Sequence, residues 1–221
     1  MTLIYNELPS IDEAIKTLSA IDLTRLLSEL GQVLIKYGLN ACFGIVLVHR
    51  HFILAEDEQM VELKDGEKLI TCVFTNGIPD AQVVNKFNLH VPSLPEVVGS
   101  SLVVTKSGLL AYEYRCTTDS RAREQLEIMN GVSLDFRADW SDVLEKFGME
   151  NRFGLIALED EDLRFRCEES FLNERVSIHW DIVNRGSSDE PMETPTVWYA
   201  SDLGHLMECR KCQHSDDGSE D

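Results

Sequence analysis

Apolar positions along the chain follow a helical period in two long stretches. In the first, apolar side chains recur three or four positions apart between Asp22 and Gly38, at Leu23, Leu26, Leu27, Leu30, Val33 and Leu34. Asp22 is a preferred residue at a helix start, and Gly38 suits the left-handed position after a helix end. A second helix is predicted over about 139–147, with Gly148 as its stop. The spacing of a capping box predicts a third, shorter helix over 10–18.

Two continuous apolar runs predict buried β-strands. They are FGIVLV at 43–48 and FGLIAL at 153–158, and the first contains several of the β-branched residues that strands favour. Shorter strands are predicted at 59–63, 68–74, 101–105, 109–115, 176–183 and 196–200. Asp-Gly between the first two of these is a strong hairpin signal, and Lys-Ser-Gly separates the next two. Residues 76–100, with three prolines and no sustained period, are expected to be mostly loop, and 120–129 to be helical.

The two apolar strands belong to a longer self-similarity with an offset of 110 residues. The segment KYGLNACFGIVLV at 36–48 aligns with KFGMENRFGLIAL at 146–158, and four of the 13 positions are identical. In each copy a helix ends at a glycine and a short loop leads into the strand. Either the chain contains a true duplication, of 22–52 with 139–162, or both segments are ordinary helix–strand corners. A duplication predicts that the two strands are paired or pseudo-symmetric in one sheet.

These patterns together predict an α+β fold. We expect a central mixed or antiparallel sheet with two helix–glycine–strand corners, in one domain spanning 1–200. Residues 201–221 are expected to form a cysteine-containing acidic tail that is largely flexible, because its end, SDDGSED, has four acids and no base.

Composition and charge narrow the classes of partner. The 221 residues are 43% apolar, which is enough for a core, and 39 acidic against 20 basic residues leave a net charge of −19. Such an excess argues against binding nucleic acid phosphates or anionic membrane surfaces, and favours basic protein partners. The N-terminus lacks the features of a signal peptide, and no apolar run approaches the ~20 residues that span a bilayer. Six widely spread cysteines fit thiols in a reducing compartment, so we expect a cytoplasmic protein.

His49 and His51 are the first candidate for chemistry. On a strand, residues two apart point to the same face, so both imidazoles can reach one metal ion. Glu56 follows as a candidate for a further ligand or a catalytic base. The arrangement looks like half of the cupin metal motif, with Gly44 before it, but the glycine spacing differs and the second half has no clean counterpart.

Cys209 and Cys212 are the second candidate. Cys-x2-Cys is the spacing of a zinc knuckle, in which two thiolates take adjacent tetrahedral corners. The remaining ligands would come from distant residues such as His205, His49 or Cys167. The alternative is two ordinary cysteines in an exposed tail.

The segment from Phe43 to Phe52, which ends in His-Arg-His-Phe and is followed by acidic residues near Glu56, resembles a group of uncharacterised proteins of filamentous fungi. Those proteins are also similar in a late strand with tryptophan, here Val197-Trp198-Tyr199, and in a cysteine-containing tail. The resemblance covers about a quarter of the chain. It implies an intracellular fungal protein, and it brings no activity, cofactor or partner.

Two classes of function remain open. The first is a non-enzymatic binding or interaction module that carries a zinc ion at Cys209 and Cys212 and takes a basic protein partner. The second is a metal-dependent, cupin-like enzyme acting on a small molecule, with His49 and His51 as ligands. We favour the first, because no complete catalytic set lies close together in the sequence, so the catalytic residues are unknown and zinc is the one cofactor indicated.

Overall fold

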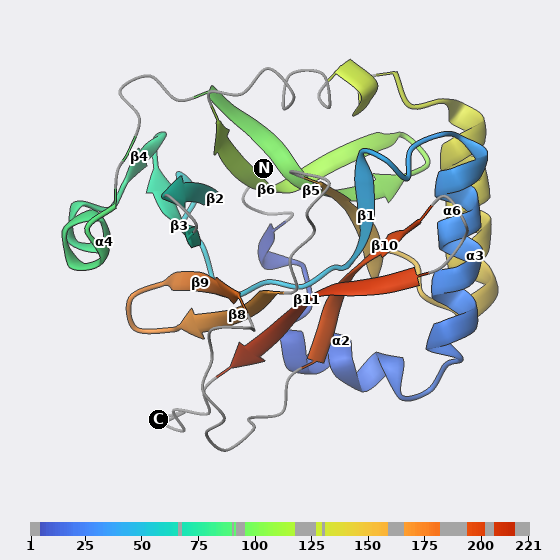
Figure 1. The fold of residues 1–221 in the computed structure, drawn as a ribbon, viewed down its shortest axis with the longest axis horizontal. Coiled ribbons are helices and arrows are strands. Elements are labelled where there is room, and N and C mark those ends of the chain that lie inside the picture. Colours follow the sequence, from blue (N-terminus) through green and yellow to red (C-terminus); the bar gives the residue numbers. More distant parts are fainter. Residues whose placement is uncertain are drawn as a thin grey trace.

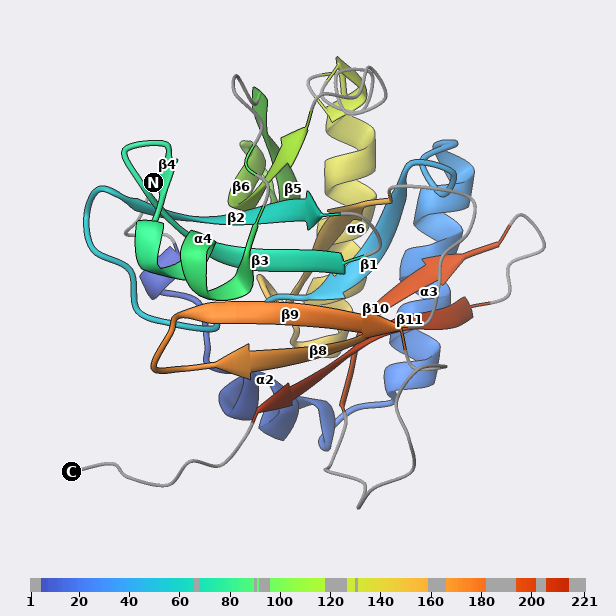
Figure 2. The same ribbon diagram turned by 60° about the vertical axis from the view of Figure 1, so that its left-hand side comes forward.

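A computed structural model shows one α+β body built on a single large sheet (Figures 1 and 2). It describes residues 5–65, 68–89, 91, 96–117, 127–129, 131–158, 166–181, 194–201 and 206–214. Of the last segment and of a few strand ends, the description covers the backbone alone.

Four helices of at least seven residues lie within this part of the chain, and their ends follow local capping rules. Helix α2 (Ile11–Leu18) begins with the predicted capping box, in which Ser10 and Glu13 bond each other's backbone. Helix α3 (Leu23–Lys36) is capped by the side chain of Asp22. The other two helices are α4 (Ala81–Phe87) and α6 (Leu134–Phe147).

The strands are mostly those that the apolar patterns predict, and some are longer. They are β1 (Phe43–Leu47), β2 (Glu58–Asp65), β3 (Lys68–Thr75), β4 (Ile78–Pro79), β5 (Glu96–Thr105), β6 (Gly108–Thr117), β7 (Phe153–Ala157), β8 (Arg166–Phe171), β9 (Val176–Asp181), β10 (Thr194–Ala200) and β11 (Leu206–His214).

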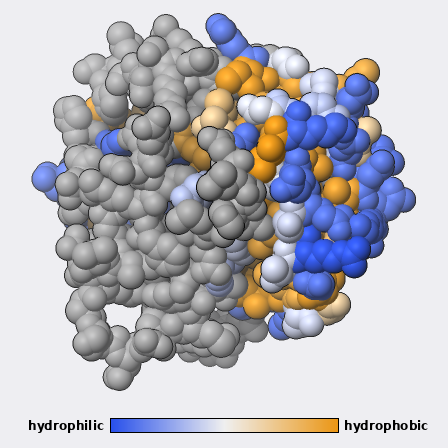
Figure 3. Space-filling model, turned by 45° about the vertical axis from the view of Figure 1, so that its right-hand side comes forward, coloured by the Kyte–Doolittle hydropathy of each residue, from blue (hydrophilic) through white to orange (hydrophobic). Residues whose placement is uncertain are grey.

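The sheet closes on itself. Its order is β2-β6-β5-β7-β1-β10-β11-β8-β9-β3-β4, and β2 also pairs with β3 along its whole length. Ten strands therefore form a ring, with the two-residue β4 added beside β3. Helices α3 and α6 lie side by side outside one part of the ring, and α4 lies at the opposite end (Figure 1). Hydrophilic and hydrophobic side chains are intermixed on the described part of the face toward α3 and α6 (Figure 3).

The two copies of the sequence repeat are related by a local two-fold arrangement. Strands β1 and β7 pair antiparallel with Ile45 opposite Leu155, and these are equivalent positions at the 110-residue offset. Exchanging β1 with β7, β2 with β8, β3 with β9, β5 with β10 and β6 with β11 reproduces the same order around the ring. The paired, pseudo-symmetric strands that a duplication predicts are therefore present.

Individual contacts obey the same exchange. Lys36 of α3 donates a hydrogen bond to Asp139 of α6, and Lys146 of α6 donates one to Glu29 of α3. The two lysines are 110 residues apart in the sequence, and so are the two acids. The helix ends also match. Gly38 and Gly148 have φ of 67° and 68°, and the amide of the residue after each glycine donates to the carbonyl of the residue five positions earlier.

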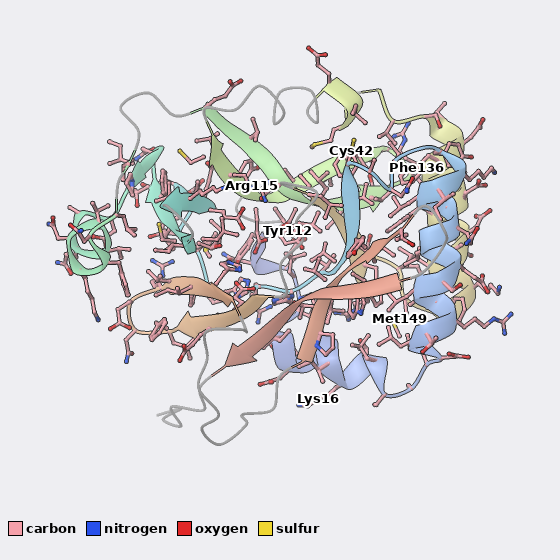
Figure 4. All side chains as sticks on the ribbon, viewed as in Figure 1. Lys16, Cys42, Tyr112, Arg115, Phe136 and Met149 are labelled. Atoms are coloured by element: carbon pink, nitrogen blue, oxygen red, sulfur yellow. The ribbon has the colours of Figure 1, made fainter. Side chains whose placement is uncertain are left out.

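Four buried apolar clusters accompany the ring. The first fills the space between the ring and α3 and α6, and it contains Phe43, Leu155, Phe136 and Trp140 among others. The second lies under α4, at the far end. The third is inside the ring and includes Tyr112, Tyr5 and Met60. The fourth contains one residue each from β1, β7 and β10. Tyr112 lies in the middle of the molecule, and Phe136 and Met149 lie toward the two long helices (Figure 4).

Several boundaries differ from the predictions. Residues 76–100 are not mostly loop, because 81–87 form α4 and 96–100 begin β5. The predicted tail is wrong for 206–214, which form β11 and complete the ring, so the folded domain extends beyond residue 200. The acidic end at 215–221 lies outside the described residues, as does most of the helix predicted over 120–129.

Further differences concern the second half of the chain. Helix α6 begins at Leu134, five residues before the predicted start, because Ser133 caps it. Strand β8 was not predicted at all. No helix in the described part of the chain is long and apolar enough to cross a membrane.

Candidate functional site

Three histidines and two glutamates converge inside the ring, and we call this group the interior cluster. His49 and His51 follow β1, while Glu113, Glu168 and His179 lie on β6, β8 and β9. His49, Glu168 and His179 are at most 5% exposed, and His51 is 9% exposed. Because side chains alternate along a strand, His179 faces the interior while its neighbour Ile178 packs in the second apolar cluster. Beside the other residues, Val48, Phe52 and Tyr112 belong to the apolar cluster inside the ring.

His51 stands at the centre of the interior cluster. Its Nε2 lies 3.5 Å from Oε1 of Glu113 and 3.3 Å from Oε1 of Glu168. On the other side of the imidazole, Nδ1 of His51 lies 3.2 Å from the hydroxyl oxygen of Ser170, which is 2.8 Å from the hydroxyl oxygen of Ser177. Both nitrogens of this imidazole therefore face groups that can exchange protons with it.

The carboxylate of Glu168 links the two halves of the cluster. Besides His51, its Oε1 lies 3.7 Å from Nε2 of His179, and that nitrogen is 3.1 Å from the hydroxyl of Thr71. A buried carboxylate is costly unless positive or hydrogen-bonding groups surround it. The two imidazoles provide those groups for Glu168.

His49 differs from the other two histidines because its ring faces the backbone. Its Nδ1 donates to the carbonyl oxygen of Leu47 at 2.8 Å, and its ring lies 4.7 Å from the ring of His51 in an edge-to-face contact. Burial, and then the charge of His51, lower the pKa of His49 from 6.5 to about 4. His49 is therefore neutral near pH 7.

Tyr5 closes the cluster from the N-terminal side. Its hydroxyl oxygen accepts a hydrogen bond from the backbone amide of His51 at 3.0 Å. Burial, and then the charge of Glu113, raise the pKa of Tyr5 well above its usual value of 10, so its hydroxyl stays protonated. The N-terminal segment thus fixes the position of the His51 backbone.

The pseudo-symmetric exchange relates β8, which carries Glu168, to β2, which carries Glu62. Parallel strands β2 and β6 align Glu62 with Arg115, and Nε of Arg115 lies 2.6 Å from Oε1 of Glu62 in a buried ion pair (Arg115 is labelled in Figure 4). The corresponding parallel pair is β8 and β11, which aligns Glu168 with Cys212. Glu62 thus has an arginine at the aligned position of the neighbouring strand, whereas Glu168 has a cysteine there. The imidazoles of His51 and His179 face the carboxylate of Glu168 instead.

The structure brings together some of the residues predicted from the sequence. His49 and His51 lie in contact, but both follow the end of β1 at Leu47, whereas the prediction placed them on a strand. Glu56 is exposed in the turn before β2, and the carboxylates at His51 are those of Glu113 and Glu168. Sequence reasoning missed these two glutamates. The signal that could have found Glu113 is a charged residue on the inward side of an alternating strand.

The two cysteine candidates lie on one strand. Cys209 and Cys212 are both within β11, whereas a zinc knuckle places its two cysteines around a turn. Of the distant ligands considered, Cys167 on β8 is aligned with Lys211, next to Cys212 in register, and His205 lies outside the described residues. The register therefore places the backbone of Cys212 beside the strand that carries Glu168.

Metal geometry is not met by the side chains described. Among them, no group of three or more histidine, cysteine, aspartate or glutamate residues is arranged to hold a metal ion. The interior cluster as it stands is a network of carboxylates, imidazoles and hydroxyls that can share and move protons.

Comparisons with known proteins identify no relative. No protein-family model matches the chain, and no similar curated protein or solved structure was found. The resemblance to fungal proteins stays a prediction.

Proposed function

We propose that the protein is a non-enzymatic binding module for a basic protein partner. The observation that carries this proposal is the enclosure of the interior cluster. His51, Glu168 and His179 are buried within the ring, and the two imidazoles face the carboxylate of Glu168 at 3.3 and 3.7 Å, which suits a network that fixes the fold. A catalytic site needs a substrate in contact with its reacting groups.

The surface supports the same proposal by its charge. With a net charge of −19, the protein attracts basic partners over a range of about 10 Å at moderate salt and repels acidic ones. Electrostatic attraction of this kind mainly increases the rate of association and selects the sign of the partner's charge.

The test is to identify a partner and then rebuild the complex from purified components. The tagged full chain is cross-linked in cells, and each recovered protein is purified and titrated against it at low and high salt. We expect a basic protein whose affinity falls as salt rises. Turnover of a small molecule by the purified chain, or salt-independent binding of an acidic protein, would overturn the proposal.

A variant inside the ring separates the two classes of function. Glu113→Gln removes a charge from the interior cluster but keeps the shape of the side chain. If the cluster serves the fold, this variant binds the partner as the wild type does, provided that its circular dichroism is unchanged. A folded variant that has lost the partner would contradict a purely structural cluster.

A zinc ion is the second candidate, and one observation favours it. The register of β8 and β11 aligns Cys212 with Glu168, whose carboxylate faces His51 and His179. A thiolate, two imidazoles and a carboxylate are all ligands that zinc accepts. Elemental analysis of the wild type, of His49→Ala/His51→Ala and of Cys209→Ser/Cys212→Ser tests this. Stoichiometric zinc that disappears in the cysteine variant supports a zinc-bearing module. Iron, copper or manganese that disappears in the histidine variant supports the metal-dependent enzyme, and wild type without metal removes both.

A further inference from the structure

Three large apolar side chains are exposed on three turns at one end of the ring. Ile53 is 62% exposed in the segment before β2, Ile78 is 68% exposed on the two-residue β4 that follows the turn after β3, and Leu172 is 47% exposed between β8 and β9. These turns, 53–58, 75–80 and 172–175, lie at the end of the molecule away from α3 and α6 in both ribbon views (Figures 1 and 2). We call them the turn surface.

Side chains fasten the three turns to one another. The guanidinium of Arg175 donates to both carboxylate oxygens of Glu58, at 2.8 and 2.6 Å, and to the carbonyl oxygen of Ile53 at 2.6 Å. On the other side of the same segment, the backbone amide and the side chain of Asn76 donate to Asp57. The turn surface is therefore held in one conformation before any partner arrives.

The backbone at two of these turns supports the same conclusion. Arg175 and Asn76 both have positive φ, at 55° and 53°. A non-glycine residue in this region has a conformational cost of order 1 kcal/mol or more, and it persists when the surroundings fix it. Rigid turns lose little entropy when a partner binds, so affinity per contact is higher.

The charge of the turn surface is one-sided. Its three segments contain five carboxylates and a single basic residue, Arg175. Arg175 is already bound to Glu58, while Glu56, Asp57 and Asp80 are exposed. Exposed apolar side chains surrounded by carboxylates match a segment that has apolar and basic residues together.

We infer that the turn surface docks a basic, apolar segment of a partner protein, with Ile53, Ile78 and Leu172 as its apolar contacts. This inference rests on the proposed binding function and adds where the partner binds and which chemistry it presents. Apolar contacts supply the affinity, and the surrounding carboxylates select positive charge.

The test uses a short fluorescent peptide of leucine and lysine, its leucine–glutamate counterpart, and the full chain. The variant is Ile53→Ser/Ile78→Ser/Leu172→Ser, which leaves the net charge unchanged. The matched control is Leu110→Ser/Leu134→Ser, which removes exposed apolar side chains elsewhere. We expect the wild type and the control to bind the basic peptide equally, and the triple variant to bind at least tenfold more weakly, or about 1.4 kcal/mol. Hydrogen exchange should slow in the three turns when the peptide is added.

Other outcomes separate this inference from the proposed function. If both variants bind as the wild type does, the turn surface is not the docking site, although the binding function stands. If the wild type does not bind the basic peptide, or binds the acidic one equally, both proposals fail. Sedimentation of the wild type alone as a dimer that the triple variant abolishes would assign the turn surface to a second copy of the chain and overturn the basic partner.

Discussion

The neutral, buried His49 makes the fold sensitive to acid in a way that can be calculated. Its pKa falls from 6.5 to about 4 in the folded protein, chiefly because burial disfavours the charged ring. The unfolded chain therefore takes up a proton below pH 6.5 that the folded chain does not bind until about pH 4. The stability associated with His49 is complete above pH 6.5 and is lost as the pH falls toward 4.

The size of this loss follows from the two pKa values. At about pH 5, the unfolded imidazole is almost fully protonated and the folded one is about a tenth protonated, which corresponds to about 2 kcal/mol in the free energy of unfolding. The perturbation that isolates it is His49→Gln, because the amide can still donate to the carbonyl of Leu47 but does not titrate.

The assay is urea unfolding followed by tryptophan fluorescence, near pH 7.5 and near pH 5. We expect the wild type to lose about 2 kcal/mol more than His49→Gln between the two conditions. Carboxylates and the other histidines titrate in both proteins, so their contributions cancel in the difference. Equal losses in the two proteins would refute the reasoning and show that His49 binds its proton normally in the folded state.

Three further predictions concern buried contacts. Gly154→Ala should lower the free energy of unfolding by about 3 kcal/mol or prevent folding, because the new methyl group overlaps the carbonyl oxygen of Leu102. A urea unfolding curve like that of the wild type would contradict the register of β5 and β7. Glu62→Leu should lower the free energy of unfolding by about 3–5 kcal/mol, because it removes the carboxylate that faces the buried guanidinium of Arg115, whereas Glu62→Leu/Arg115→Leu should recover much of this loss. Equal losses in the two variants would argue against the ion pair. Burial raises the pKa of Cys72 to about 12, so peptide mass mapping should detect its alkylation by iodoacetamide at pH 8 after denaturation and not before.

The elements that sequence patterns predicted are those whose signals are local. The strands at 43–48 and 153–158 are continuous apolar runs because the helices cover one side and the ring encloses the other. Strand β8, with sequence RCEESF, escaped because Glu168 and Ser170 face the ring interior, so the buried side of this strand is polar. The expectation that buried positions carry apolar side chains does not hold for the interior of this ring.

The same limit applies to the interior cluster. His49 and His51 are two residues apart, and their spacing identified them. Pairing between strands that are distant in the sequence brings Glu113, Glu168 and His179 close to these two histidines. The spacing of residues along the chain does not indicate which strands pair. Finding them requires the sheet order, which depends on how the two halves close together.

Closure of the ring by two interleaved halves also governs how the chain can fold during synthesis. β1 pairs with β7 and β10, and β3 with β9, so strands made early wait for segments about 110 to 150 residues later. A ribosome that adds roughly 5–20 residues per second needs about 5–30 s to make them. For that interval the apolar residues of β1 have no sheet neighbours, so nascent chains should depend on chaperones until the last strand emerges.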